Sequence, residues 1–468
     1  MKQHIHPICK FTVSVFCSLF IIFTSYPNPC FAETRRIEIP SSPNPVGSGA
    51  RALGMGGALI AVADDATAAS WNPAGLLQLD LPEISVVLDG FHRIEDNTFG
   101  NQPDNASGPQ TVSKAGINYL SATYPFSLWG RNMNFSLNYQ HLYDFTQKWN
   151  IPLEFEEEYE SERRTEDHQQ EGRLSALGIA YAVQVNLNLS FGFTLNIWDN
   201  DLTGNEWEQK AYSYGSLTVK PPDGNGDRAG ESYAKELKLP FGISSVDKYS
   251  FSGINANFGI LWEKYYQKGK KLSIGAVFKM PFTADLEHEA SSCSLNPGDS
   301  EPNCPHPSEE SASLKMPMSY GIGVAYRFCD EFIASLDLYR TEWDDCILTD
   351  TNFKGERKSR SPITGKEPDD VDPTHQIRAG LEYLIIGSEY IFPLRMGAFY
   401  DPAPAEGSPD DFFGFSIGSG IGDGECFAFD IAYQYRFGND VRKFMLDNLD
   451  FSQDVKEHTV YASVIIYF

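Results

Sequence analysis

One stretch of the sequence has residue types that could bind phosphate: GSGARALGMGG, from Gly47 to Gly57. The backbone N–H groups of such a loop cradle a phosphate when a strand precedes the glycines and a helix follows them in a βαβ unit. The surrounding residues provide no such unit, so a nucleotide site is not predicted. Glycine and alanine also let one backbone approach another closely, and a need for close packing is the alternative explanation.

Other residues that could perform catalysis do not form a recognisable set. The pairs Asp64-Asp65 and Asp410-Asp411 have no nucleophile or metal-ligand spacing beside them, and the histidines are scattered. These carboxylates are therefore interpreted as solvated or capping groups. A hydrolase would need a serine, a histidine and an orienting polar group on one surface. We predict no enzyme, no catalytic residues, no metal and no cofactor.

Two cysteines indicate a disulfide. Cys293 and Cys304 flank the polar turn SLNPGDSEPN, and an oxidising compartment would join them. A zinc site is the weaker interpretation, because no CxxC pair or spaced histidine accompanies them.

The N-terminus indicates export of the protein, and the net charge excludes one class of partner. Lys2 and Lys10 precede the apolar run FTVSVFCSLFIIF, and a small residue follows at Ala32. This pattern predicts a signal peptide over residues 1–32, because the run is shorter than the roughly 20 residues of a membrane-spanning helix. The net charge of −26 argues against binding nucleic acid, which requires a basic surface.

From residue 83 onward, apolar and polar residues alternate with a period of two, which is typical of β-strands with one apolar face. LNLSFGFTLNIW, at 187–198, and FAFDIAYQYRF, at 427–437, are the clearest examples. The pattern predicts an all-β chain. The expected strands number about fourteen, which is even, as in single-chain bacterial outer-membrane barrels. The fourteen expected strands are 83–93, 114–125, 132–143, 172–184, 187–198, 248–263, 270–283, 314–328, 331–343, 374–385, 389–400, 411–420, 425–437 and 456–468.

The connections between these strands alternate between long and short. Long polar segments such as EFEEEYESERRTEDHQQ alternate with tight turns such as SLWGR and GDG. Outer-membrane barrels have long outer loops and short periplasmic turns, whereas a soluble β-sandwich has no reason to keep this order. We therefore expect a fourteen-stranded antiparallel transmembrane barrel over residues 82–468, located in the bacterial outer membrane.

The last expected strand, HTVYASVIIYF, ends on the outward-facing aromatic residue Phe468. This ending resembles the C-terminal signal that the barrel-assembly machinery recognises. Since an open sheet edge is not tolerated in lipid, the strand is expected to pair with EISVVLDGF, at 83–91.

Three segments resemble one family. The stretch from Gly47 to Leu76, together with GAVFKMPF at 275–282 and PLRMGAFYDPAPA at 393–405, resembles the FadL/TodX outer-membrane transport proteins, which carry long-chain fatty acids or aromatic hydrocarbons. The resemblance implies a barrel whose lumen holds a small N-terminal hatch, here residues 33–81. It also implies that a hydrophobic substrate enters a lumen site and leaves sideways through the wall near a kinked strand.

The resemblance assigns roles to the small residues at the start of the chain. Gly54, Gly56 and Gly57 are expected to pack the hatch, because glycine permits close backbone contact. Asn72-Pro73-Ala74 matches a family motif that implies contact between hatch and wall. An ordinary turn is the alternative, since Asn before Pro often starts one.

Alternation places several charged residues inside the lumen, because a charge facing lipid costs about 2–4 kcal/mol at the bilayer midplane. Two interpretations remain open. The charges form a salt-bridge network that holds the hatch, or a basic residue meets a substrate carboxylate. The basic candidates are Lys279, Arg378, Arg395 and Arg436.

The outer connection 199–247 contains an apolar cluster within an otherwise polar loop, which suggests an exposed docking groove for a hydrophobic ligand. Packing of the loop on itself is the alternative. The groove candidates are Trp207, Tyr212, Tyr214 and Leu217. Acidic outer loops disfavour an anionic fatty acid at the entrance. A neutral hydrocarbon is therefore an alternative cargo.

The predicted function is passive uptake of hydrophobic small molecules by hatch rearrangement and lateral exit. The alternative is a non-enzymatic barrel that acts as a partner or shuttle in protein secretion or surface attachment. Expected partners are outer-membrane lipid, lipopolysaccharide, a hydrophobic ligand and the assembly machinery, with the protein itself a monomer.

Overall fold

The computed structural model describes residues 47–102, 104–219, 237–267, 269–351 and 357–468. Contacts divide the chain into one unit over residues 1–35 and a second over 36–468, and only residues of the second are described. The predicted signal peptide, cleavage after Ala32 and hatch residues 33–46 lie outside these ranges. Within them, no helix is long and apolar enough to cross a membrane.

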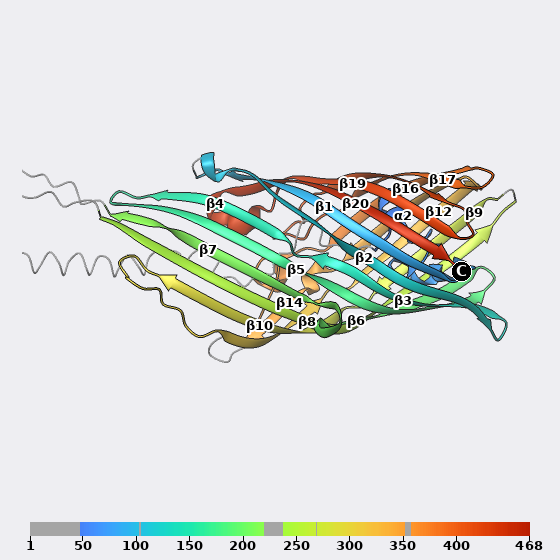
Figure 1. Ribbon diagram of the computed structural model, residues 1–468, viewed down its shortest axis with the longest axis horizontal. Coiled ribbons are helices and arrows are strands. Elements are labelled where there is room, and N and C mark those ends of the chain that lie inside the picture. The colour runs from blue at the N-terminus through green and yellow to red at the C-terminus, as the bar shows by residue number, and fades with distance from the viewer. Residues whose placement is uncertain (1–46, 103, 220–236, 268, 352–356) are drawn as a thin grey trace, which may run out of the picture. The chain divides into compact units, whose positions relative to one another are not determined.

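Fourteen antiparallel strands close into a barrel (Figure 1), which confirms the predicted fold class. Each strand pairs with the next around the ring, and the last pairs with the first. The barrel strands are β1 (Glu83–Phe99), β2 (Gly108–Leu128), β3 (Arg131–Asp144), β5 (Glu160–Asn186), β6 (Leu189–Trp198), β8 (Leu237–Tyr265), β9 (Lys271–Lys279), β12 (Ser319–Cys329), β13 (Phe332–Thr341), β16 (Thr374–Ile386), β17 (Ile391–Tyr400), β18 (Phe413–Gly422), β19 (Phe427–Val441) and β20 (Phe451–Tyr467).

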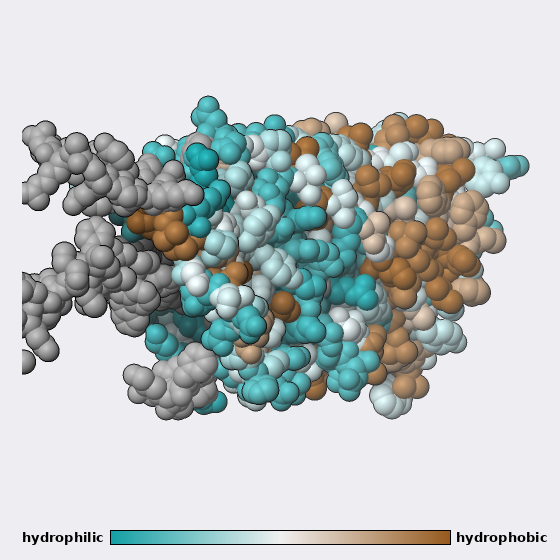
Figure 2. Space-filling model, turned by 60° about the vertical axis from the view of Figure 1, so that its left-hand side comes forward, coloured by the Kyte–Doolittle hydropathy of each residue, from teal (hydrophilic) through white to brown (hydrophobic). Residues whose placement is uncertain are grey.

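The alternation in sequence becomes an alternation of faces. In β16, Ile377 and Leu381 are exposed on the outside of the barrel, whereas Arg378 and Glu382 are buried inside it. Outward-facing apolar residues of many strands gather in a band over one end of the barrel (Figure 2). This band is the surface that contacts membrane lipid.

Closure of the barrel joins the two ends of its sequence. β1 and β20 pair from Glu83–Tyr467 to Phe99–Phe451 without a shift in register. The N–H of Phe468 donates to the carbonyl of Pro82 at 2.9 Å. The ladder therefore leaves no open edge at this strand pair.

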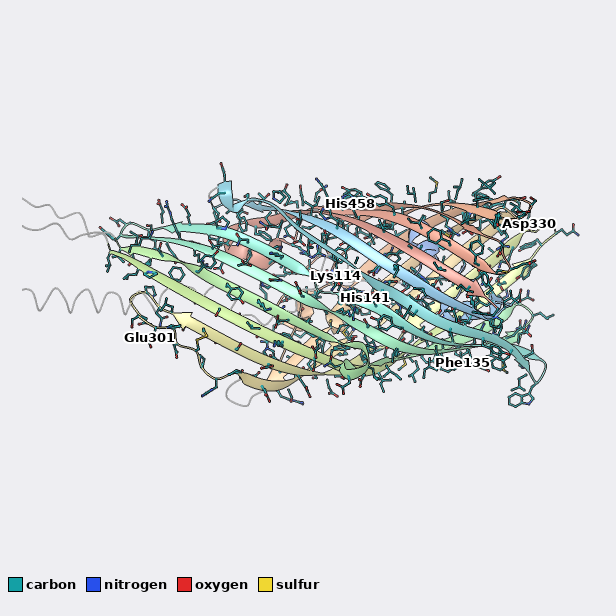
Figure 3. All side chains as sticks on the ribbon, viewed as in Figure 1. Lys114, Phe135, His141, Glu301, Asp330 and His458 are labelled. Carbon is teal, nitrogen blue, oxygen red and sulfur yellow. A yellow bond between two sulfur atoms is a disulfide. The ribbon has the colours of Figure 1, made fainter. Side chains whose placement is uncertain are left out.

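The two ends of the barrel differ in their connections. Short turns such as the one at Asp330 lie at the end that carries the apolar band, and long connections such as the one containing Glu301 lie at the other end (Figure 3). Several long connections contain further strands where loops were predicted from the sequence. They are β4 (Gln147–Glu156), β7 (Glu206–Val219), β10 (Phe282–Leu295), β11 (Ser308–Met316), β14 (Ile347–Thr351) and β15 (Arg357–Arg360).

These six strands and the outer halves of β5 and β8 form a second part of the structure, which we call the extension. Its strands pair in the order β4, β5, β7, β8, β10, β11, β14 and β15. β5 and β8 have 27 and 29 residues, so each continues from the barrel into the extension. Short helical turns complete the connections: η2 (Asp104–Ala106), α4 (Asn200–Thr203), η3 (Trp343–Asp345), η4 (Pro368–Asp370) and η5 (Lys443–Leu449).

Two single strands predicted from sequence are each divided in the structure. The segment 270–283 breaks between β9 and β10 at Met280-Pro281, and 314–328 breaks between β11 and β12 at Pro317-Met318. Proline has no N–H to donate to the ladder. The ladder of β8 with β9 ends at Asn257–Lys279, and that of β8 with β10 begins at Ser252–Asp285. We call this level, residues 253–256, 280–281 and 317–318, the seam.

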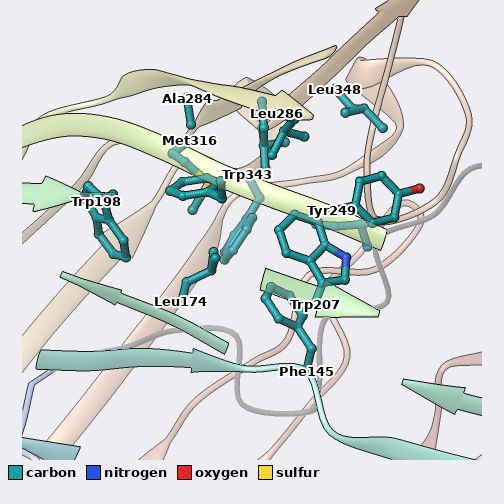
Figure 4. Packing of buried hydrophobic residues seen from close by; sticks show 14 of the residues in the cluster. Phe145, Leu174, Trp198, Trp207, Tyr249, Ala284, Leu286, Met316, Trp343 and Leu348 are labelled. Carbon is teal, nitrogen blue, oxygen red and sulfur yellow. The ribbon is translucent and has the colours of Figure 1, made fainter. Parts of the chain in front are cut away.

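The extension has an apolar core of its own, rich in aromatic side chains (Figure 4). Trp207 and Tyr249 stack with ring centroids 4.8 Å apart, and Tyr249 stacks on His288 at 4.3 Å. Phe145, Trp198 and Trp343 join the same cluster. Burial of large rings is a strong source of stability, which explains how a sheet outside the membrane band remains ordered.

Candidate functional site

The N-terminal segment, residues 47–79, is nearly all buried and packs against inward-facing residues of the barrel wall. It contains the short helices α2 (Ala50–Gly54), α3 (Ala68–Trp71) and η1 (Pro73–Gln78). The Trp71 indole donates to the Ser48 carbonyl at 2.7 Å, which ties the two ends of the segment together. Its apolar side chains, Trp71 among them, form one cluster with Ala180, Ala182, Ala325 and Ile333 of the wall.

The three glycines predicted to pack the hatch lie against the wall. A Cβ added at Gly54 would be 3.1 Å from the Cα of Gly418, and one at Gly56 would be 3.1 Å from the carbonyl of Ala379. Gly56 and Gly57 also have φ of +67° and +76°, a region that side chains disfavour. Small size and backbone conformation both require glycine here.

The wall presents matching glycines, which the sequence analysis missed. A Cβ at Gly397 would lie 2.2 Å from the N of Gly56, and one at Gly380 would lie 2.5 Å from the Met55 carbonyl. Gly275 faces the Ile60 carbonyl in the same way, at 2.4 Å. A glycine in a strand often marks a close backbone approach, and these three take up inward positions of the alternation, which is the signal that could have found them.

Asn72, Pro73 and Ala74 contact the wall at β6 and β8. The Asn72 amide donates to the Ile260 carbonyl of β8 at 3.1 Å and to the Ile60 carbonyl of the segment at 2.8 Å. Its side-chain oxygen accepts from the Ala74 N–H, so the same residues also make a turn. A Cβ at Gly192 would be 2.4 Å from Pro73, and one at Gly259 would be 2.0 Å from Asn72 Oδ1.

Polar side chains from all around the wall bind the backbone of the segment. Ser463 accepts from the Ala50 N–H at 2.7 Å, Ser416 accepts from Gly56 at 2.9 Å, and Asp337 accepts from Ile60 at 2.8 Å. Tyr119 and Thr194 donate to its carbonyls, each at 2.8 Å. The segment is therefore held by many separate bonds to β2, β6, β13, β18 and β20.

All three predicted lumen arginines are paired with carboxylates, and Arg395 belongs to a network that includes the segment. Arg395 donates to Glu382 at 2.6 Å and to Asp430 at 2.5 Å. Arg51 of the segment binds the same Glu382 through two bonds of 2.9 Å, and it also pairs with Asp64. This chain of charges joins segment and wall, as expected for a network that holds the segment.

Arg378 and Arg436 share a second carboxylate, Asp401. Arg378 Nη2 lies 3.3 Å from Asp401 and its Nη1 donates to the Gly56 carbonyl at 3.1 Å. Arg436 Nε donates to Asp401 at 3.2 Å, and its guanidinium lies over the Phe412 ring. Lys279 lines a cavity at the seam, and Arg378 lines another beside the segment.

Among the described residues, the barrel interior contains cavities, two of which border the predicted site residues. The larger, about 160 Å³, borders the segment at Gly49 and Trp71 and is otherwise lined largely by charged residues such as Asp89, Arg93 and His141. The smaller, about 70 Å³, lies at the seam. Asn72, Pro73 and Ala74 line neither of them.

Above the apolar band, a buried charge network links barrel and extension. Glu95 of β1 accepts from Arg93 at 2.9 Å, from Arg442 at 3.3 Å and from the indole of Trp149 in β4 at 2.6 Å. Burial alone would raise the pKa of Glu95, but the two guanidiniums and the indole donor outweigh it and lower that pKa.

The predicted docking groove is corrected by the structure. Trp207 and Leu217 are buried in the interior of the extension, whereas Tyr212 and Tyr214 are exposed on its other side. All four belong to β7, where successive side chains point to opposite faces. They cannot line one exposed groove. Trp207 and Leu217 instead pack within the connection itself, which was the alternative interpretation.

The structure places Cys293 and Cys304 in a disulfide within the extension. Within the described ranges, no group of three or more histidine, cysteine, aspartate or glutamate residues could hold a metal ion. The Asp64-Asp65 pair is neither solvated nor capping: Asp64 pairs with Arg51, and the buried Asp65 accepts from the Thr67 N–H at 2.8 Å before α3, which has no side-chain cap.

Comparison with solved structures identifies similar barrels. A Pseudomonas aeruginosa FadL homologue aligns with a TM-score of 0.57 at 14% identity, covering 92% of this chain and 100% of that one. The Pseudomonas putida toluene transporter TodX gives 0.53 at 14%, with 90% and 98% covered. The CymD monoaromatic hydrocarbon channel gives 0.51 at 16%, with 91% and 98% covered. These similarities show a shared fold.

No curated protein sequence matches the chain. The family model described as outer membrane protein transport protein (OMPP1/FadL/TodX) matches residues 45–460. Members of this family are transport channels of the outer membrane and not enzymes. The chain therefore belongs to the OMPP1/FadL/TodX family of outer-membrane transport proteins.

Proposed function

We propose that this protein lets hydrophobic small molecules, long-chain fatty acids or aromatic hydrocarbons, pass the outer membrane without energy input. The N-terminal segment acts as the hatch, with residues 33–81 as its extent. Two of the similar barrels are described as a toluene transporter and a monoaromatic hydrocarbon channel, which supports the aromatic class. Family membership supports the general role.

The observation that carries the hatch proposal is the composition of the interface between segment and wall. Beside apolar contacts with wall residues such as Ala180 and Ala182, the interface contains glycine contacts, backbone bonds to wall side chains, and the chain Arg51–Glu382–Arg395. Polar bonds exchange with water at a small net cost of about 0.5–1.5 kcal/mol each. A segment held in this way can shift within a polar lumen without exposing a large apolar core.

Passage requires this shift, because the cavities of about 160 and 70 Å³ border a lumen occupied by the segment. The molecule then leaves through the wall into the membrane. At the outer end, acidic loops favour a neutral cargo over an anion unless divalent cations bridge those loops to lipopolysaccharide.

Uptake by a deletion strain tests the function. Labelled toluene and labelled oleate should enter more slowly than in the parent, and the wild-type gene should restore entry of the true cargo class. Unchanged uptake of both compounds would refute the proposed transport. A Glu382→Gln variant should alter uptake because it removes the charge shared by Arg51 and Arg395. The matched Glu154→Gln variant, on the exposed face of the extension, should not.

Assembly and partners follow from the same fold. We propose that Phe468, which is 68% exposed beside the closing strand pair, contacts the barrel-assembly machinery. The monomer is proposed as the working unit, since the lumen, the segment and both cavities belong to one chain.

A further inference from the structure

The smaller cavity lies at the seam, where the barrel gives way to the extension. Its apolar side is made by Trp198, Phe282, Met316 and Trp343. The rings of Trp198 and Phe282 stack with centroids 5.8 Å apart. Trp198, Met316 and Trp343 lie within the apolar cluster of Figure 4. This side of the cavity suits a flat apolar body.

The opposite side of the cavity is polar and buried. Asn196 and Tyr339 are 2% and 5% exposed, and both line the cavity. The side-chain oxygens of Asn196, Asn257 and Tyr339 are buried and accept or donate no hydrogen bond within the described part of the chain. A buried polar atom without a partner costs about 1–3 kcal/mol, so Asn196 Oδ1 and the Tyr339 hydroxyl at one cavity point to an occupant that pairs with both.

The identity of the Asn196 atoms follows from its neighbours. The indole N–H of Trp198 can only donate, and it lies 3.0 Å from Oδ1 of Asn255. That atom is therefore an oxygen. The Asn196 atom 3.1 Å from the same oxygen must then be the donor Nδ2. Asn196 is left with Oδ1, an acceptor that requires a donor from the occupant.

We propose that the seam cavity binds compact ring compounds that carry one hydroxyl group, of which phenol is the simplest, in preference to the bare hydrocarbon. The hydroxyl donates to Asn196 Oδ1 and accepts from the Tyr339 hydroxyl, while the ring packs on Trp198 and Phe282. Lys279 lines the same cavity, and its charge disfavours a protonated amine as the donor. The inference rests on the proposed function, since it names a substrate class within it.

Entry of a ring needs local adjustment of the cavity. The volume is about 70 Å³, whereas an apolar cavity known to hold benzene has about 150 Å³. Met280 and Met316 are the flexible part of the lining, because methionine has three rotatable bonds and adapts to irregular shapes. Bulkier substituents on the ring should therefore weaken binding.

Equilibrium dialysis of the purified, refolded protein with radiolabelled phenol or toluene tests the preference for a ring with a hydroxyl group. Toluene has a methyl group where phenol has the hydroxyl, so the ring and size are matched. Phenol should bind saturably and at least about tenfold more tightly, since toluene leaves Asn196 Oδ1 and the Tyr339 hydroxyl unpaired. Tyr339→Phe should weaken phenol binding about tenfold and leave toluene unchanged. Tyr461→Phe, at a half-buried tyrosine that lines the larger cavity, serves as the matched control.

Equal binding of phenol and toluene, or no loss in Tyr339→Phe, would overturn the inference. So would the absence of saturable phenol binding, which would mean that water alone fills the cavity. Flux of the same compounds into vesicles separates this proposal from the proposed function. Toluene flux without a phenol preference refutes only the inference. Phenol binding that Tyr339→Phe weakens, without flux of any tested compound, supports the inference and refutes the transport role.

Discussion

The core of the extension and the lumen of the barrel contain different kinds of side chain. The extension packs aromatic rings such as Trp207, Tyr249 and Trp343 into an apolar core. The barrel lumen instead places glycines and charged side chains against the N-terminal segment, with contacts such as Gly397–Gly56 and Arg51–Glu382. Rings stabilise by burial, which is lost only on unfolding, whereas the lumen contacts are individually weak and reversible. This difference supports our proposal that the extension is a permanent scaffold and that the segment is a movable part.

The largest effect is expected in the extension. Trp207→Ala should destabilise it by about 3–5 kcal/mol, because a buried aromatic ring is lost and a cavity remains. Limited proteolysis at β7 should become rapid while the barrel strands stay resistant. Tyr214→Ala, on the exposed face of the same strand, is the control. Equal protection of both variants would contradict the assignment of Trp207 to a stabilising core.

The next effect is expected at the lumen interface. Gly397→Ala should loosen the segment by about 1–3 kcal/mol, the usual cost of overpacking, because its Cβ would lie 2.2 Å from the N of Gly56. Thiol labelling of an introduced Ala50→Cys should become faster. Gly116→Ala is the control, since the nearest atom to its Cβ would be at 3.5 Å. Labelling that rises equally in both variants would argue against the close contact.

A third test concerns the network that joins the two interiors. Glu95→Gln should cost about 1.5–3 kcal/mol, the range for hydrogen bonds to charged groups. Because the folded-state pKa of Glu95 is lowered, its contribution is complete above the ordinary carboxyl value of 4.5 and is lost as pH falls through the folded-state value. Urea midpoints measured between pH 7 and pH 3 should converge for wild type and variant. A constant difference over this range would contradict the role of the charge.

The smallest effect is expected at a short turn that belongs to neither interior. Asp423 accepts from the N–H groups of Glu425, Cys426 and Phe427 at 3.0, 2.7 and 3.0 Å, and these bonds lower its pKa to about 2. The stabilisation is present above its ordinary value of 3.8 and is lost as pH falls towards 2. Pepsin cleavage at this turn should rise over that interval in wild type, while Asp423→Asn should show no such rise.

The sequence predicted the barrel better than the extension. Each of the fourteen expected strands overlaps a barrel strand, because lipid outside and a polar lumen inside impose the alternation that Ile377, Arg378 and Leu381 display. In the extension, both faces of a strand can be apolar or polar, so segments such as 154–170 read as loops. The prolines at 281 and 317 were the available signals for the breaks in the two long predicted strands.

The lumen charges were predicted as a group, but their pairing was not. Alternation places Arg395 and Glu382 inside the barrel, yet only the register of β16 with β17 puts them opposite each other. Arg51, which joins them from the segment, gives no periodic signal at all. The prediction of an exposed groove was wrong because it did not take into account that side chains alternate along a strand. In β7, Trp207 and Tyr212 lie on opposite faces.

A reversible disulfide between segment and wall tests most directly the central claim, that the N-terminal segment moves during transport. Ser463 accepts from the Ala50 backbone at 2.7 Å, so an Ala50→Cys/Ser463→Cys variant should form a disulfide that fixes the segment to the wall. Toluene flux into vesicles containing the oxidised double variant should be abolished and should return on reduction, whereas both single cysteine variants should conduct in either state. Undiminished flux through the oxidised double variant would contradict a hatch that moves.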